Sequence, residues 1–266
     1  MFFSKAEYIF LRLLRRFLFS DNCLVKYGTI IPLYQQNSNQ YCPHLIVDRY
    51  ELYARGHGLT LSGKCVLELG PGVTNSAAYE LVARGSAMVY AYEPYARYDS
   101  KTDQKLLLLI SEKYGVDPYR ISGSVKRIES LEGLPEGGID VILSHSVLEH
   151  VEAPYELFRA LHEILDQSGI MLHHVDYRDH FFKYPFHKLL FSKKTWNRWL
   201  NPGNLPGWVL KDHLCMLREA GFNAEAYDIV RDPVNFGKVK KFISRDYDRD
   251  DPMLDVVLCS IIARKI

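Results

Sequence analysis

Two carboxylates stand beside the residues whose types and spacing best suit binding of a nucleoside. Glu68 lies in an apolar run that leads into Gly70-Pro71-Gly72, and Glu93 ends the next apolar run. Glycines let the backbone pass close to a ligand, and the free amides at the start of a following helix favour an anion. Glu68 can accept hydrogen bonds from a cationic amine, and an acid placed like Glu93 reaches ribose hydroxyls in nucleotide-binding α/β folds. We therefore expect a binding site at two neighbouring strand ends.

A parallel sheet is the framework that would bring these acids together. Short apolar runs alternate with helical stretches from Cys65 onward, which indicates β-α units. The third strand is placed just before Gly123. The expected strands are residues 65–69, 87–92, 120–122, 140–144, 170–175, 224–230 and 256–263, and the expected helices are residues 74–83, 105–113, 154–165 and 210–217. The pattern predicts an α/β fold.

Two regions do not follow this alternation. Residues 1–61 precede the first strand, and we expect them to form an N-terminal cap on a domain at 62–266. Residues 176–208 are crowded with aromatic side chains. A connection of this length is usually functional or disordered, and its composition is too aromatic for disorder. Because it follows a strand end where open α/β sheets bind ligands, we interpret it as a partly helical substrate lid. A small separate core is the other interpretation.

Residues 3–19 predict a basic amphipathic helix. Arg12, Arg15 and Arg16 interrupt its apolar residues, so a secretory or membrane-spanning segment is not expected. At about 100° per residue, Lys5 and these arginines fall on one side. The other side holds Phe3, Ala6, Ile9, Phe10, Leu13, Leu14 and Phe17. Such a helix either lies in an anionic membrane interface or packs its apolar side on the domain or across a homodimer.

The overall charge argues against nucleic acid as a partner. The chain has 33 basic and 32 acidic side chains, a net charge of +1, and thus no general attraction for phosphates. Its five cysteines are widely spaced, without a Cys-x-x-Cys pair. We expect a reduced cytoplasmic protein, with membrane association depending on the N-terminal helix.

Three segments resemble, in order, the motifs of class I S-adenosylmethionine-dependent methyltransferases. They are Glu68 to Gly72, Tyr92-Glu93-Pro94, and Asp140 to Val151. The Val147-Leu148-Glu149-His150-Val151 stretch, with the helix and residues 165–170 that follow, is similar to the small-molecule branch of type 11 and type 23 domains. The resemblance implies a Rossmann-like, mostly parallel seven-stranded sheet with helices on both faces. It also implies S-adenosylmethionine as cofactor.

Carried over by position, the resemblance implies a role for each residue of the site. Gly70, Pro71 and Gly72 would line the methionine moiety, and Glu93 would hold the ribose. Thr74 replaces the third glycine of the family, and Ser124 replaces an acid often found after the third strand. The implied cofactor-binding residues are Glu68, Leu69, Gly70, Pro71, Gly72, Asn75, Glu93, Pro94, Tyr95, Ser124, Val125, Ser144 and His145.

The implied reaction is in-line displacement at an activated methyl group, for which the protein supplies alignment and a dry pocket. An oxygen or nitrogen acceptor must also lose a proton, and histidine suits that task. We take His145, His180 and Asp176 as catalytic candidates. No metal is expected, because His173 and His174, as neighbours on a strand, point to opposite faces. His150 is expected to be structural.

The methyl acceptor is expected to be a small or medium-sized molecule, with O-methylation favoured. The Asn/Asp-Pro-Pro-aromatic motif of base methylation is missing after the fourth strand, where Ser144 to Val147 stand.

Two other functions are weighed against this one. The first is an NAD-dependent oxidoreductase, whose fingerprint needs a glycine at Asn75 and has no need of Glu68. The second is a non-catalytic interaction protein on a methyltransferase scaffold, attached to a membrane surface through the N-terminal helix. The intact residues Glu68, Gly70, Gly72 and Glu93 argue against this second function.

Overall fold

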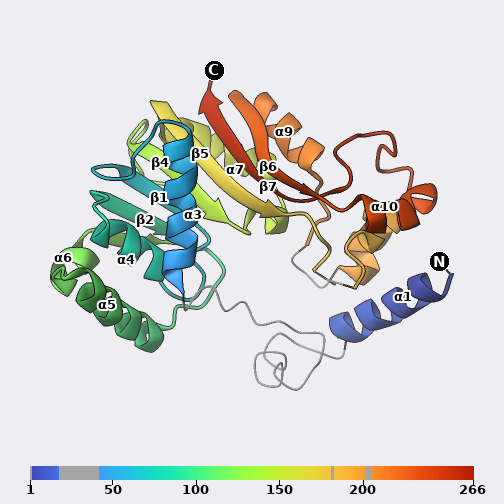
Figure 1. The fold of residues 1–266 in the computed structure, drawn as a ribbon, viewed down its shortest axis with the longest axis horizontal. Helices are drawn as coiled ribbons and strands as arrows, with labels where there is room; N and C mark the ends of the chain where they lie inside the picture. Colours follow the sequence, from blue (N-terminus) through green and yellow to red (C-terminus); the bar gives the residue numbers. More distant parts are fainter. Residues whose placement is uncertain (1, 18–41, 181–182, 202–204) are drawn as a thin grey trace.

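The computed structural model describes residues 2–17, 42–180, 183–201 and 205–266, and its centre is a seven-stranded sheet (Figure 1). The strand order is β3-β2-β1-β4-β5-β7-β6. β7 runs antiparallel to both of its neighbours, and the remaining pairs are parallel. The strands are β1 (Cys65–Leu69), β2 (Met88–Tyr92), β3 (Val125–Ile128), β4 (Ile139–His145), β5 (Leu165–Asp176), β6 (Phe222–Arg231) and β7 (Val256–Lys265). The predicted α/β sheet is confirmed.

Helices cover both faces of this sheet. The α-helices are α1 (Phe2–Phe17), α3 (Pro43–Gly56), α4 (Ser76–Ala83), α5 (Ser100–Tyr114), α6 (Pro118–Gly123), α7 (Pro154–Ile164), α8 (Lys193–Thr195), α9 (Leu210–Glu219) and α10 (Pro233–Val239). Shorter turns are η2 (Leu148–His150), η3 (His187–Leu190), η4 (Trp196–Leu200) and η5 (Lys240–Phe242). Apolar side chains of α3, α4 and α5 share one core, while those of α7 and α9 share the core on the opposite face. We call these the α3 face and the α9 face.

The third strand lies later in the chain than predicted. Residues 120–122 belong to α6, whose start is set by Pro118 in the first turn and by Asp117, whose carboxylate accepts from the Tyr119 amide at 3.2 Å. A proline at this position is favourable because its missing donor is not needed there. Ile121 therefore points into the core from a helix. The strand is β3, which begins after Gly123.

Alternation along the strands decides which polar side chains share a face. Val66 and Leu143 belong to the α3-face core, so Glu68 and His145, two residues further along β1 and β4, lie on that face as well. The same reasoning from Leu172 on β5 places His174 and Asp176 there. Ser144 and His173 consequently lie on the α9 face. The carboxyl ends of the parallel strands thus gather one set of acids and histidines above α3.

The segment 176–208 forms a third core together with α1 and α10. α1 contacts η4, and Figure 1 shows it below α10 and away from α3. The aromatic side chains of the segment 176–208 are largely buried, including Tyr184, Phe186, Phe191 and Trp196. They pack around Tyr8 of α1, whose ring stacks 5.9 Å from that of Phe191. The segment is partly helical, as predicted.

α1 presents a different side to the protein than its sequence predicted. Arg12, expected in solvent, is only 6% exposed, because it pairs with Asp179 at 3.5 Å and lies over the rings of Tyr8 and Trp196. Phe3, Phe10 and Phe17 are instead 86%, 61% and 63% exposed. The predicted end of the helix at residues 18–19 lies outside the described residues. Within the described part of the chain, no helix is both long and apolar enough to cross a membrane.

Candidate active site

The turn after β1 requires glycine for two different reasons. Gly70 and Gly72 both have left-handed backbones, with φ of 69° and 74°, a region that other residues enter at a cost. A Cβ added to Gly70 would lie 2.5 Å from Cγ2 of Val147, so the turn packs directly on the segment after β4. A Cβ added to Gly72 would have no atom of the described residues within 4 Å. Gly72 therefore faces open space.

The end of β2 is tied to this turn through Glu93. Its Oε2 accepts from the Gly72 amide at 3.1 Å, and its Oε1 accepts from the amides of Tyr95 at 3.0 Å and Ala96 at 2.9 Å. These bonds hold the carboxylate, which is 8% exposed, at the carboxyl ends of two adjacent strands. Oε2 has a further lone pair that can accept from a ligand hydroxyl.

Glu68 is a buried carboxyl group beside the same turn. It is 3% exposed, and its Oε2 finds no hydrogen-bond partner among the described residues. Burial raises the pKa of Glu68 to about 8, Arg127 counteracts this increase, and Glu93 adds to it. An unsatisfied buried acceptor is costly, and a cationic donor would satisfy it.

Arg127 is a residue of this site that sequence reasoning missed. Its guanidinium donates to the carbonyl oxygen of Gly72 at 2.6 Å and to Oδ1 of Asn75 at 3.0 Å, and it lies 5.1 Å from the centre of the Tyr98 ring. Sequence reasoning missed Arg127 because it placed the third strand at residues 120–122. In the structure, β3 pairs Arg127 with Ala91, which puts position 127 on the α3 face.

Asp103 fixes the start of the helix that follows the turn. It is 2% exposed and accepts from the Asn75 amide and from the hydroxyls of Tyr79 and Tyr98, each at 2.6 Å. Asn75, the N-cap of α4, makes no side-chain cap of its own. Its amide is instead satisfied by a carboxylate from α5, which ties the turn to that helix.

His145 ends β4 and stacks on its neighbour in the sheet. Its ring centre lies 4.9 Å from that of His174, with 17° between the planes. Burial, the nearby His174 and Arg49 lower the pKa of His145 to about 3, while Asp176 acts in the opposite direction. His145 is therefore neutral at pH 7, and its Nδ1 has no hydrogen-bond partner within the described chain.

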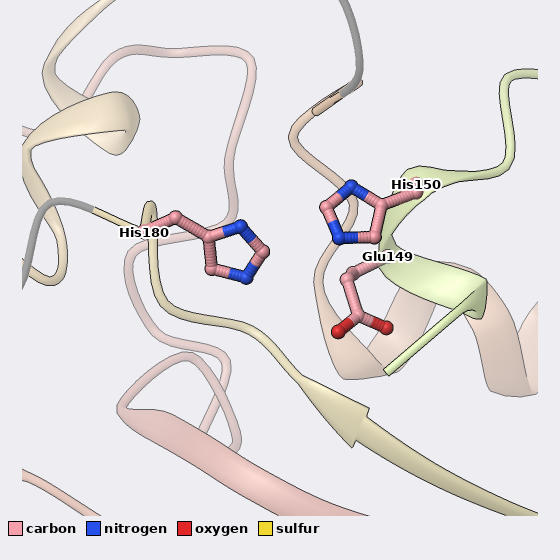
Figure 2. A group of neighbouring side chains, drawn as sticks. All are labelled: Glu149, His150 and His180. Atoms are coloured by element: carbon pink, nitrogen blue, oxygen red, sulfur yellow. The ribbon is translucent and has the colours of Figure 1, made fainter. Parts of the chain in front are cut away.

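A second group of side chains lies where the segment after β4 meets residues 176–208, the segment that the sequence predicted to be a substrate lid. Figure 2 shows Glu149 and His150, both from η2, opposite His180 from the lid. One ligand atom of each lies within 4.8 Å of the others. Burial and the adjacent His150 lower the pKa of His180 to about 4, and burial raises the pKa of Glu149 to about 8.

Asp176 lies between the two groups. Its amide donates to Glu149 Oε1 at 3.3 Å, and its charge raises the pKa of both His145 and His180. Both of its carboxylate oxygens are held by Arg178, at 2.9 Å from Nε and 2.5 Å from Nη2. Asp176 is thus an ion-paired group near each histidine.

Comparison with known families decides what kind of site this is. The sequence model of the methyltransferase domain family matches residues 39–226. The chain belongs to this family. It is a class I S-adenosylmethionine-dependent methyltransferase, and S-adenosylmethionine is its cofactor.

The solved structures that resemble this chain are distant in sequence. Phosphoethanolamine N-methyltransferase 2 of Haemonchus contortus is 13% identical with a TM-score of 0.53, and the match covers 95% of this chain and 59% of that one. A candidate sarcosine dimethylglycine methyltransferase of Galdieria sulphuraria is 15% identical with a TM-score of 0.52, covering 82% and 85%. An S-adenosylmethionine-dependent methyltransferase of Mesorhizobium loti is 16% identical with a TM-score of 0.46, covering 80% and 96%. None of the curated proteins matches the methyltransferase significantly.

The residues around the turn fit the chemistry of this cofactor. The unpartnered oxygen of Glu68 suits an ammonium group, and the open space before Gly72 leaves room for the backbone to approach a ligand. Glu93 retains acceptor capacity at the ends of β1 and β2. The structure brings these three predicted residues together at one edge of the methyltransferase sheet.

Some of the predicted cofactor residues lie elsewhere. The carbonyl of Ser124 accepts from the Val89 amide at 2.9 Å, so Ser124 and Val125 stand at the amino end of β3, away from Glu93. Their expected role rested on the wrong strand boundary, and our proposal omits them. Glu129 and Ser130 follow the carboxyl end of the strand instead.

Three more predicted residues have environments that sequence alone did not show. Ser144 is fully buried on the α9 face, where its hydroxyl lies 2.7 Å from Nδ1 of His173. Pro94 is exposed, and the side chain of Tyr95 is 93% exposed. Leu69 is buried in the α9-face core, and Pro71 lies in the turn itself.

Proposed function

We propose that this methyltransferase transfers a methyl group to an oxygen of a small or medium-sized acceptor, with His145 as the general base. The supporting observation is the position of His145 at the end of β4, two residues before Val147, the side chain that packs on Gly70. A base at this strand end stands beside the turn that we assign to the methionine moiety. Bound S-adenosylmethionine supplies a methyl group that is already activated.

The chain's own residues hold and orient the two reactants. Glu68 accepts from the ammonium group, Glu93 Oε2 accepts from a ribose hydroxyl, and Arg127 keeps the turn in place through its bonds to Gly72 and Asn75. Pro94, Tyr95 and the residues after β3 border the adenine. Positioning of this kind is the main contribution that a protein makes to methyl transfer.

A weakly basic histidine is sufficient for this reaction. A hydroxyl oxygen becomes strongly acidic as its bond to the methyl carbon forms, so its proton passes readily even to an imidazole of low pKa. Because burial keeps His145 neutral, its ring nitrogen is ready to accept that proton. Asp176, on the same face of the sheet, stabilises the cationic imidazole through its charge.

The test is methyl transfer from labelled S-adenosylmethionine to a panel of small hydroxylated molecules and matched amines. We expect transfer to hydroxyls, and its loss in His145→Gln while binding of S-adenosylhomocysteine is retained. Transfer to amines alone would contradict O-methylation, and full activity of His145→Gln would contradict the role of the base.

We also propose that α1 contacts an anionic membrane surface. Phe3, Phe10 and Phe17 are seven residues apart, which is close to two helical turns, so they lie on one face, and all three are exposed. Arg15 and Arg16 are the basic residues of the last turn, although Arg16 also donates to the backbone oxygens of Asn197 and Asn201, at 3.1 and 2.9 Å. An apolar face with basic neighbours is typical of helices that lie in the membrane interface. A homodimer through the same face is the competing outcome.

A further inference from the structure

Glu149, His150 and His180 form a cluster that the reaction described above does not use. Glu149 and His150 come from η2, directly after β4, whereas His180 comes from the lid. Their ligand atoms lie within 4.8 Å of one another, and Figure 2 shows all three side chains converging on the same space. The ring centres of the two histidines are 4.9 Å apart.

The carboxylate of Glu149 provides a second, independent observation that points to a ligand. Glu149 is 2% exposed. Its Oε1 accepts from the Asp176 amide, but its Oε2 is buried without a hydrogen-bond partner among the described residues. Leaving such an oxygen unsatisfied in the interior is unfavourable, and a cation between the three side chains would satisfy it.

The lid residue is held in place by a contact from another part of the chain. Asp179, next to His180, is fully buried and pairs with Arg12 of α1 at 3.5 Å. It also accepts from the Lys188 amide at 3.3 Å. These contacts anchor the lid backbone at the position that faces η2, so the cluster does not depend on a freely moving loop.

We propose that Glu149, His150 and His180 bind one divalent transition-metal ion. Two imidazoles and a carboxylate are a ligand set that zinc and non-haem iron use with positions left open for other ligands, whereas Mg²⁺ and Ca²⁺ prefer oxygen ligands. Ligands about 2.1 Å from a tetrahedral ion are about 3.4 Å from one another, so modest side-chain rotation closes the observed arrangement.

The proposed ion would lie beside the acceptor side of the active site. Asp176 connects it to His145, because its amide contacts Glu149 and its charge acts on both histidines. An acceptor oxygen in an open coordination position would lose its proton more easily. This last role rests on the O-methyl transfer proposed above, but metal binding itself does not.

This proposal departs from the expectation of no metal, which considered only the adjacent pair His173 and His174. His150 and His180 are distant in sequence, and no spacing rule connects them. The tertiary structure supplies the pairing.

The experiment is a Co²⁺ titration of the full chain, without a histidine tag and after treatment with chelator. We expect one equivalent of Co²⁺ to bind with visible d–d absorption, Zn²⁺ to displace it, and Mg²⁺ to fail to do so. Glu149→Gln, His150→Gln and His180→Gln should each weaken binding at least tenfold. His44→Gln, a histidine variant in the first turn of α3, is the matched control and should bind as the wild type does.

Circular dichroism and binding of S-adenosylhomocysteine, measured on the same samples, show that each variant is folded. No stoichiometric Co²⁺ binding by the wild type would overturn the proposal, as would an equal loss of affinity in His44→Gln. Metal binding without methyl transfer to any hydroxyl would contradict only the proposed O-methylation. Methyl transfer by a chain that binds no metal would contradict only the metal site.

Discussion

The amide of Gly72 donates a hydrogen bond to Oε2 of Glu93 at 3.1 Å, which joins the turn after β1 to the end of β2. Two segments 21 residues apart are thereby held at one edge of the sheet. The bond gives Glu93 a structural task in addition to the ribose contact that we propose. Substitutions at the two positions should accordingly affect both stability and cofactor binding.

Glu93→Gln should weaken binding of S-adenosylhomocysteine about 10- to 100-fold, because hydrogen bonds to a charged acceptor contribute about 1.5–3 kcal/mol. Isothermal titration calorimetry measures the dissociation constant. Glu132→Gln, a substitution of an exposed acid, is the control and should leave binding unchanged. An unaltered dissociation constant for Glu93→Gln would rule out the proposed contact.

Gly70→Ala and Gly72→Ala should separate stability from binding. At Gly70 the left-handed backbone and the contact with Val147 both oppose a Cβ, so we expect a loss of about 2–4 kcal/mol in the free energy of unfolding. At Gly72 only the backbone cost of about 1–2 kcal/mol applies, but the methyl group occupies the space that we assign to the cofactor.

Urea unfolding and calorimetry measure the two effects. For Gly72→Ala, the loss in binding free energy for S-adenosylhomocysteine should exceed the loss in the free energy of unfolding. The double variant Gly70→Ala, Val147→Ala should lose less free energy of unfolding than the two single variants lose together, because truncation of Val147 removes the clash. Strict additivity would show that Val147 is not the obstacle.

The contribution of Glu68 to the stability of the cofactor-free protein should decline as the pH rises from about 5 to about 8. Buried histidines with lowered pKa values, such as His145 and His180, act in the opposite direction below about pH 6.5, so the difference between the wild type and Glu68→Gln is the quantity to measure. Burial raises the pKa of Glu68 to about 8, while an unfolded glutamate titrates near about 4.3. Between these values the folded protein holds a proton on Glu68 that the unfolded chain has released, so this group lowers the free energy of unfolding with a slope of up to about 1.4 kcal/mol per pH unit.

Glu68→Gln carries no proton to release, so its profile should lack this contribution, and the stability of the wild type relative to the variant should fall over this range. Urea unfolding at several pH values provides the measurement. A difference between the two profiles that stays constant with pH would show that Glu68 is ionised in the folded state.

Phe3→Ser, Phe10→Ser and Phe17→Ser, combined in one variant, should abolish binding to vesicles that contain anionic lipid. The melting temperature should change little, because these side chains are exposed. Co-sedimentation at low salt measures the binding, and Leu108→Ser on exposed α5 surface is the control. A wild type that does not sediment, and that elutes as a dimer disrupted by the triple substitution, would support the homodimer instead.

Local patterns in the sequence were sufficient to predict most of the sheet. β1, β4 and β7 each present an apolar run with clear ends, and Pro154 and Gly221 mark helix boundaries that the structure confirms. The prediction of the third strand was wrong because Ile121 fits the apolar pattern of a helix as well as that of a strand. There, Asp117 and Pro118 favoured the helix through capping.

The orientation of α1 illustrates a second limit. The periodicity correctly predicted a helix, but a helical wheel assigns charged residues to solvent by default. The partner of Arg12 is Asp179, which lies far along the chain and is buried. Long-range ion pairs of this kind leave no trace in local periodicity.

The sequence by itself determined the class of fold, the glycine turn with Glu68, and the acid at the end of the second strand, because each depends on residues close together in the chain. Only the tertiary structure revealed that Arg127 secures that turn, that His145 stacks on His174, and that Glu149 and His150 meet His180. These contacts join separate strands and the segment 176–208, so they exist only once the sheet has aligned its strand ends and that segment has packed against them.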